Sequence, residues 1–120
     1  YESKISIGEH GQFFTTKHIC DMIAKLQSYK DGDTMSDPCC GSGRFFISVS
    51  KENKNIKFHG VDIDLVCVKM AVLNMWLFDL DADIYHGNSL TMDMQRVWAI
   101  RKGGYIWEKS IDKAENIERV

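Results

Sequence analysis

Residues 37–45 read Asp-Pro-Cys-Cys-Gly-Ser-Gly-Arg-Phe, and this stretch decides the fold. A short extended segment at residues 34–36 leads into it, and Pro38 ends the strand because proline cannot donate a ladder hydrogen bond. Two glycines then bracket one serine directly before a helical pattern at residues 44–51, and glycine permits a tight turn and close backbone approach to a ligand. The stretch therefore predicts a strand–loop–helix unit whose helix N-terminus can bind polar ligand atoms.

Hydrophobic periodicity on both sides of this unit predicts the remaining elements. Ile19, Met22, Ile23 and Leu26 stand at helical spacing, and either Thr15 or Thr16 is expected as the N-cap. The other expected elements are a helix over residues 16–28, strands over 57–61 and 82–85, a nearly all-apolar helix over 65–80, a helix over 91–100 and a short strand over 105–107.

The order helix, β, α, β, α, β predicts an α/β fold. Short connections between the elements favour βαβ units, and such units imply a parallel sheet with helices on both faces. We expect residues 1–120 to form a single, incomplete domain. Within it, residues 1–33 are a lead-in segment with the first helix, and residues 34–108 are a ligand-binding βαβαβ core.

Composition excludes several classes of protein. The net charge is −2, which argues against a stand-alone nucleic-acid-binding module. The four cysteines show no CxxC spacing and the four histidines are scattered singly, so neither a metal site nor a disulfide framework is expected. Reduced cysteines favour a cytoplasmic protein, and no apolar run reaches the length needed to cross a membrane.

Ligands of a parallel sheet bind at the carboxyl ends of its strands, where residues 37–43, 62–64 and 87–90 should meet. Asp37 would repel a pyrophosphate but attract an ammonium group. The first loop is neither a phosphate-binding GxxxxGK[ST] loop nor a full GxGxxG fingerprint. An ordinary βα turn explains this loop as well as a ligand site does, when it is considered alone.

The other two loops narrow the choice of ligand. Asp62 lies 21 residues after Gly41, a spacing at which a carboxylate can accept hydrogen bonds from both ribose hydroxyls. An acidic residue here could instead cap the following helix, and we assign that role to Asp64. Asn88, followed by Ser89, offers a donor and an acceptor to an adenine edge, although a turn residue is equally consistent. Together the loops describe a pocket for adenosine with a cationic, amino-acid-like tail, which is S-adenosylmethionine.

Five segments in order resemble the N6-adenine DNA methyltransferases, and in particular the modification subunit of type I restriction systems. Residues 11–15 (GQFFT) and 37–45 resemble the family's paired G-Q-[FY]-[FY]-T-P and D-P-x-[CA]-G-[ST]-G motifs, with Thr16 in place of the proline. Residues 60–64 (GVDID), 71–75 (AVLNM) and 86–90 (HGNSL) resemble the segments that follow. The resemblance covers roughly residues 8–92 and implies a Rossmann-like S-adenosylmethionine-dependent methyltransferase fold.

The resemblance also implies roles for individual residues. The segment 12–15 and Asp37 would hold the methionine part, residues 41–43 would pass under the cofactor, and Asp62 would hold the ribose. Ile63 would pack on the adenine, and Asn88 would touch its amino edge, where the family usually has Asp. The expected cofactor-binding residues are Gln12, Phe13, Phe14, Thr15, Asp37, Cys39, Gly41, Ser42, Gly43, Asp62, Ile63, Asn88 and Ser89.

The family's chemistry needs a later [DNS]-P-P-[FYW] motif, which positions an adenine flipped out of the duplex. This sequence has one proline and therefore no Pro-Pro pair, so we expect no catalytic residue in it. The complete enzyme would bind DNA, and a missing C-terminal half or another chain would supply catalysis and target recognition. The alternatives are a degenerate methyltransferase-like domain used for binding or assembly, and a methyltransferase for a different acceptor.

Overall fold

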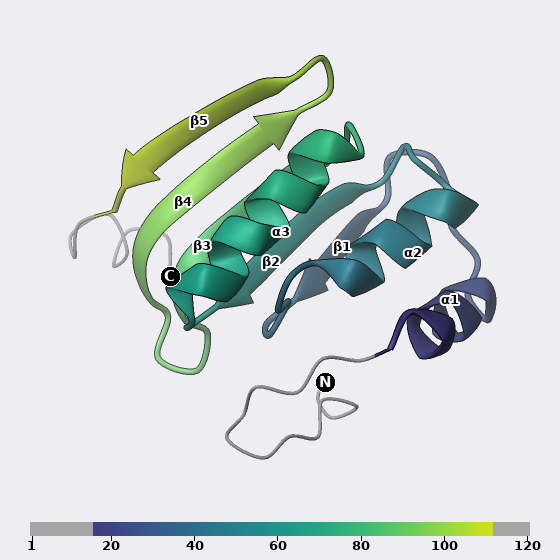
Figure 1. Ribbon diagram of the computed structural model, residues 1–120, viewed down its shortest axis with the longest axis horizontal. Coiled ribbons are helices and arrows are strands. Elements are labelled where there is room, and N and C mark those ends of the chain that lie inside the picture. The colour runs from purple at the N-terminus through teal and green to yellow at the C-terminus, as the bar shows by residue number, and fades with distance from the viewer. Residues whose placement is uncertain (1–15, 112–120) are drawn as a thin grey trace.

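The computed structural model describes residues 16–111, which form one five-stranded sheet with helices packed on it (Figure 1). This confirms the α/β class. The elements are α1 (Lys17–Lys25), β1 (Thr34–Asp37), α2 (Arg44–Glu52), β2 (Lys57–Asp62), α3 (Leu65–Leu77), β3 (Asp81–Asn88), β4 (Asp93–Arg101) and β5 (Tyr105–Ser110).

The sheet has the order β1-β2-β3-β4-β5 and changes direction halfway. Strands β1, β2 and β3 are parallel, as the βαβ order predicts. Strands β4 and β5 continue from β3 as antiparallel neighbours. The sheet is therefore mixed, and the predicted parallel sheet is confirmed only for its first three strands.

One face of the sheet carries the core. Helices α2 and α3 cover this face, and α1 packs against α2 (Figure 1). The register places Phe58, Ala82 and Ile100 side by side on it, and the Phe46 ring of α2 lies 4.8 Å from the Phe58 ring between centroids. The expected helices on the second face are not found among residues 16–111.

The helix expected over residues 91–100 is wrong, because β4 occupies this segment. Burial along β4 follows the two-residue period of a strand, with Met94, Trp98 and Ile100 buried. The turn after β4 places Gly103 and Gly104 at φ of 97° and 86°, and residues without a side chain adopt these angles readily. The glycine pair therefore makes a hairpin, and residues 93–101 pair with β3 on one side and β5 on the other instead of forming a helix.

The second face of the sheet is polar over β2, β3 and β4. The Asp83 carboxylate accepts a hydrogen bond from Arg101 at 3.0 Å and lies 3.5 Å from the Lys57 ammonium. His59 Nδ1 is 3.7 Å from the same carboxylate, and burial lowers the pKa of His59. The longest described helix, α3, has 13 residues, and no described helix is long and apolar enough to cross a membrane.

Candidate cofactor site

Three loops meet at the carboxyl ends of β1, β2 and β3, as the sequence predicts. The loop after β1 forms backbone hydrogen bonds with the end of β2, because the Cys40 amide donates to the Val61 carbonyl at 2.9 Å. The Gly41 amide donates to the Asp62 carboxylate at 3.0 Å, and the Asp64 amide donates to the other oxygen of that carboxylate at 2.9 Å. Asp62 thus fixes the glycine loop and its own turn together.

The third loop is tied to both of the others. The Ser89 hydroxyl donates to the Pro38 carbonyl at 3.1 Å, which joins the loops after β3 and β1. The His86 Nε2 atom lies 3.1 Å from the Ile63 carbonyl, which joins the ends of β3 and β2. Each pair of loops therefore shares at least one polar contact, and the site has a defined shape before any ligand binds.

Close packing requires glycine at two positions around the first loop. Gly43, at φ 81°, is the N-cap residue of α2, and a Cβ atom there would lie 3.1 Å from the Met75 side chain of α3. A Cβ atom on Gly60 of β2 would lie 2.8 Å from Cys40 Sγ, closer than real side chains approach. The loop is thus seated directly on β2 and on α3.

Asp37 supplies the main electrostatic feature of the site. Its carboxylate is partly buried at the end of β1, and it accepts a hydrogen bond from the Cys39 amide at 2.9 Å. Burial raises the pKa of Asp37, and no described Lys, Arg or His forms an ion pair with it. A cationic ligand group would offset the cost of burying this charge, whereas an anionic group would add to it.

Asp64 and Asn88 hold the local backbone. Asp64 is the N-cap of α3, and its side chain accepts from the Val66 amide at 2.9 Å, which confirms its expected assignment to the helix start. The Asn88 side-chain oxygen accepts from the Leu90 amide at 2.9 Å and the Thr91 amide at 3.4 Å. The acceptor of Asn88 is therefore engaged in a turn, and its NH₂ group is the part left to face a ligand.

Some of the remaining expected site residues lie within the described part of the chain and others lie outside it. Cys39 and Ile63 are exposed, and Ser42 is buried beneath the loop. Gln12, Phe13, Phe14 and Thr15 lie outside the described residues. The described helix α1 begins directly after Thr16, whose hydroxyl caps it by accepting from the Ile19 amide at 3.4 Å.

Sequence reasoning assigned no role to two residues that hold the loops. The Asn74 side chain of α3 donates to the Ser42 carbonyl at 2.9 Å, and His86 contacts the Ile63 carbonyl. Asn74 is one of only two strongly polar positions in an otherwise apolar helical pattern, and that isolation could have marked it. No pattern marks His86, since its contact joins residues 23 apart in the chain.

All four cysteines are thiols within the described residues. Burial raises the pKa of Cys67 to about 11 and raises that of Cys40 well above its usual value, so both side chains act as small apolar groups of the core. Residues 16–111 contain no group of three or more His, Cys, Asp or Glu side chains that could hold a metal ion.

The fold and the site together define an α/β domain with the features of S-adenosylmethionine-dependent methyltransferases. A solved structure from Listeria monocytogenes, described as a class I S-adenosylmethionine-dependent methyltransferase, is similar with a TM-score of 0.59 and 20% identity. The match covers 70% of this chain and 29% of that chain. At this identity the likeness concerns the fold.

Sequence comparison identifies the family. The family model described as N-6 DNA Methylase matches residues 3–113, and the chain belongs to this family. The methylase subunit of the type I restriction enzyme MjaVIII of Methanocaldococcus jannaschii is 32% identical over 88 residues, which cover 68% of this chain and 15% of that protein. The HindI methylase subunit of Haemophilus influenzae is 29% identical over 90 residues, which cover 68% of this chain and 20% of that protein. The chain thus spans a fifth or less of these relatives.

Family and fold both imply S-adenosylmethionine as the cofactor. The residues at the carboxyl ends of the strands fit it, because a partly buried Asp37 suits its ammonium group and the acidic edge disfavours phosphate-bearing cofactors. When bound, this cofactor supplies an electrophilic methyl group.

Proposed function

We propose that this chain binds S-adenosylmethionine as the cofactor-binding part of an adenine-N6 DNA methyltransferase of a restriction–modification system. The observation that carries the proposal is the partly buried Asp37 carboxylate beside the glycine loop, without a cationic partner among the described residues. In this proposal residues 1–33 are a lead-in segment with the first helix, and residues 34–108 are the cofactor-binding core.

Each of the expected site residues has a role in this proposal. Asp37, together with Gln12, Phe13, Phe14 and Thr15, holds the methionine part, and Cys39, Gly41, Ser42 and Gly43 form the loop beneath the cofactor. Asp62 accepts hydrogen bonds from the ribose with the lone pairs that its two backbone donors leave open. Ile63 packs on the adenine, and Ser89 keeps the third loop closed on the first.

The contacts of the Asn88 side chain support a more specific proposal for its role. Both backbone donors of its turn use the side-chain oxygen, so the NH₂ group is the part that can meet adenine. An NH₂ donor matches a ring-nitrogen acceptor of adenine rather than the amino group. We therefore place Asn88 against a ring nitrogen.

Transfer to adenine needs a Pro-Pro motif that this sequence does not contain. We propose that the rest of the enzyme supplies it, along with the DNA contacts. In the relatives' names, the methylase subunit is part of a type I restriction enzyme, and partner subunits are proposed for this protein on that basis.

Titration calorimetry with S-adenosylmethionine tests the cofactor proposal. We expect saturable binding to residues 1–120, and the absence of both heat and a thermal shift at saturating cofactor would overturn it. Incubation with adenine-containing duplex DNA and methyl-labelled cofactor should give no transfer by this chain alone. Transfer would refute the proposed need for the missing motif.

A further inference from the structure

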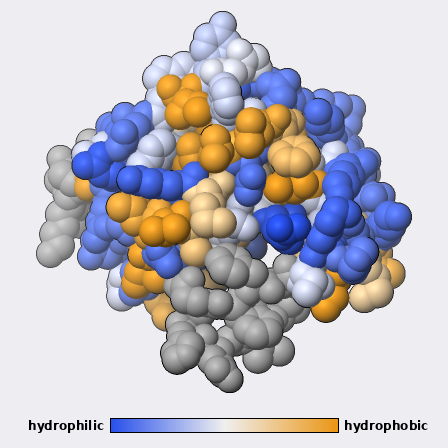
Figure 2. All heavy atoms as spheres, in the orientation of Figure 1, coloured by the Kyte–Doolittle hydropathy of each residue, from blue (hydrophilic) through white to orange (hydrophobic). Residues whose placement is uncertain are grey.

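An apolar stripe runs along the outer side of α3. Its members are Val66, Met70, Leu73 and Leu77, whose exposed fractions lie between 43% and 65%. They stand at positions i, i+4, i+7 and i+11, which form one continuous line roughly 16 Å long on the helix. Hydrophobic surface gathers over α3 on the face shown in Figure 2. A continuous line of this kind, unlike scattered apolar residues, marks an interaction surface.

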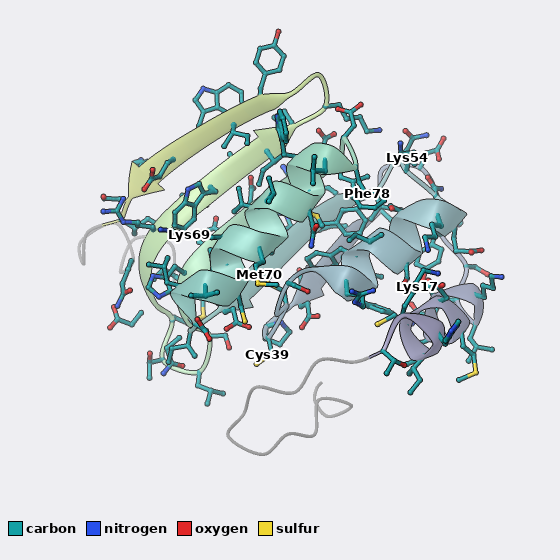
Figure 3. The ribbon with its side chains drawn as sticks, viewed as in Figure 1. Lys17, Cys39, Lys54, Lys69, Met70 and Phe78 are labelled. Atoms are coloured by element: carbon teal, nitrogen blue, oxygen red, sulfur yellow. The ribbon has the colours of Figure 1, made fainter. Side chains whose placement is uncertain are left out.

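Positive charge borders the stripe on one side. Lys69 is the only charged residue of α3, is exposed, and projects beside Met70 (Figure 3). Neither the first nor the last turn of the helix adds an acidic residue. The stripe therefore has a cationic border along this flank.

A cationic cleft borders the stripe on the other side. It has a volume of about 220 Å³ and lies between α1, α2 and the end of α3, where Phe78 forms part of its wall (Figure 3). Lys17, Arg44 and Lys51 all line it. Lys17 and Lys51 share the Asp21 carboxylate at 2.9 and 3.5 Å, whereas Arg44 forms no ion pair with any described residue. One carboxylate therefore pairs with two of the three cations, and the cleft carries excess positive charge.

We propose that this surface binds an amphipathic helix of a partner protein, with an apolar stripe of about three turns flanked by Asp or Glu. The apolar side chains of the partner would cover Val66, Met70, Leu73 and Leu77. Its acidic side chains would reach Lys69 on one flank and Arg44 in the cleft on the other. This surface adjoins the cofactor site at Asn74, which lines the cleft and donates to the Ser42 carbonyl of the glycine loop. None of its residues is proposed to contact the cofactor, so the proposal does not depend on cofactor binding.

Two other occupants fit less well. A DNA backbone would satisfy the cations but leave the apolar stripe against charged phosphates. A second copy of this chain would bring the same surface against itself, and its cations would then face cations across a two-fold axis. Only an acidic amphipathic segment satisfies the stripe and both of its borders.

Synthetic peptides of about 18 residues test the proposal, since shorter helices are marginal in water. One peptide carries leucines at the spacing of the stripe with glutamates on both flanks, and the second replaces each glutamate with lysine. Fluorescence anisotropy should show the glutamate peptide binding at least about tenfold more tightly, a difference of about 1.4 kcal/mol. Equal affinities, or no binding of either peptide, would overturn the proposal.

Variants locate the binding surface. Arg44→Glu should remove most of the preference for the glutamate peptide, and Leu73→Gln with Leu77→Gln should weaken binding about tenfold. Lys54→Glu and Leu26→Gln are the matched controls, since both residues are exposed and neither lines the cleft or the stripe. Equal loss in a control variant would contradict the assigned surface. Thermal melting confirms that each variant is folded.

Two further measurements separate the competing occupants. Tight binding of a duplex oligonucleotide that Arg44→Glu abolishes, with no peptide binding, would replace the proposal with a nucleic-acid surface. Sedimentation showing a dimer that dissociates in the Leu73→Gln, Leu77→Gln variant would replace it with self-association.

Discussion

The segment from β1 to β3 and the hairpin of β4 and β5 share one sheet but are held together differently. In the first segment, side chains such as Asp62, Ser89 and Asn74 bond to the backbone of neighbouring loops. In the hairpin, all six residues of β5 are exposed, and the Arg96–Glu108 ion pair joins the two strands at the surface. The first segment therefore builds a site, whereas the second covers an edge of the sheet and part of the core.

The two segments should therefore differ in how substitutions affect cofactor binding and stability. Substitutions in the first segment should change both the stability and the cofactor affinity, because the same contacts hold the core and shape the loops. Substitutions in β5 should change stability slightly and leave the affinity alone.

Gly60→Ala should destabilise the protein by about 2–3 kcal/mol, because its new methyl group would meet the Cys40 side chain in a closely packed place. Gly32→Ala is the matched control: it has φ of +88° with no atom within 4 Å, so only backbone strain of about 1 kcal/mol applies. Urea unfolding measures the free energy of unfolding of both variants. A smaller loss for Gly60→Ala than for Gly32→Ala would contradict the seating of the loop on β2.

Asp62→Ala should lower the affinity for S-adenosylmethionine by roughly 10- to 100-fold, since a charged hydrogen-bond partner contributes about 1.5–3 kcal/mol. The variant also loses the bonds from the Gly41 and Asp64 amides, which keep the two loops together. Glu108→Ala in the hairpin is the control and should leave the affinity unchanged. An equal loss in both variants would remove the distinction between the two segments.

Cofactor affinity should fall about tenfold per pH unit as the solution is acidified through the raised pKa of Asp37, because the proton competes with the ammonium group. Asp37→Asn should bind more weakly at neutral pH and lose this dependence. Because the pKa of Asp37 is raised in the folded protein, the ionised carboxylate lowers the free energy of unfolding at pH values above this raised pKa. This loss of stability disappears below the ordinary pKa of a carboxyl group. Calorimetry from neutral to acidic pH measures the affinity, and an identical pH profile in the variant would contradict the role.

Trp107→Ala should destabilise the protein by about 1 kcal/mol or less. The Trp107 ring stacks on Tyr105 with centroids 6.1 Å apart, but it is more than half exposed on an edge strand. The affinity for S-adenosylmethionine should not change, as titration of the variant would show. A marked loss of affinity would mean that the hairpin supports the site more directly than its contacts indicate.

Local sequence signals predicted most of the first segment. Pro38, the glycines of residues 41–43 and the apolar pattern of α3 act over a few neighbours, so they specify elements without knowledge of the rest of the chain. The same signals failed at β4, where a strand was taken for a helix. Antiparallel pairing with β3 and the Gly103–Gly104 turn decided that segment, and pairing with a distant strand is not encoded locally.

The candidate site divides along the same line. Spacing placed Asp37, Asp62 and Asn88 at one edge of the sheet, and the structure brings their loops together. The spacing could not predict that the side-chain oxygen of Asn88 accepts hydrogen bonds within its own turn, or that His86 contacts the Ile63 carbonyl. Such contacts depend on the exact register and twist of neighbouring strands.

By itself, the sequence determined the α/β order, the glycine loop after β1, the acidic residues at the strand ends and the resemblance to a family. The tertiary structure alone decided the change to antiparallel strands, the bonds that close the three loops on one another, and the alignment of the α3 stripe with the cleft. The physical reason is the distance along the chain over which each kind of interaction acts. Backbone preferences and periodicity act between near neighbours, whereas burial, register and the meeting of charges arise only when distant segments pack together.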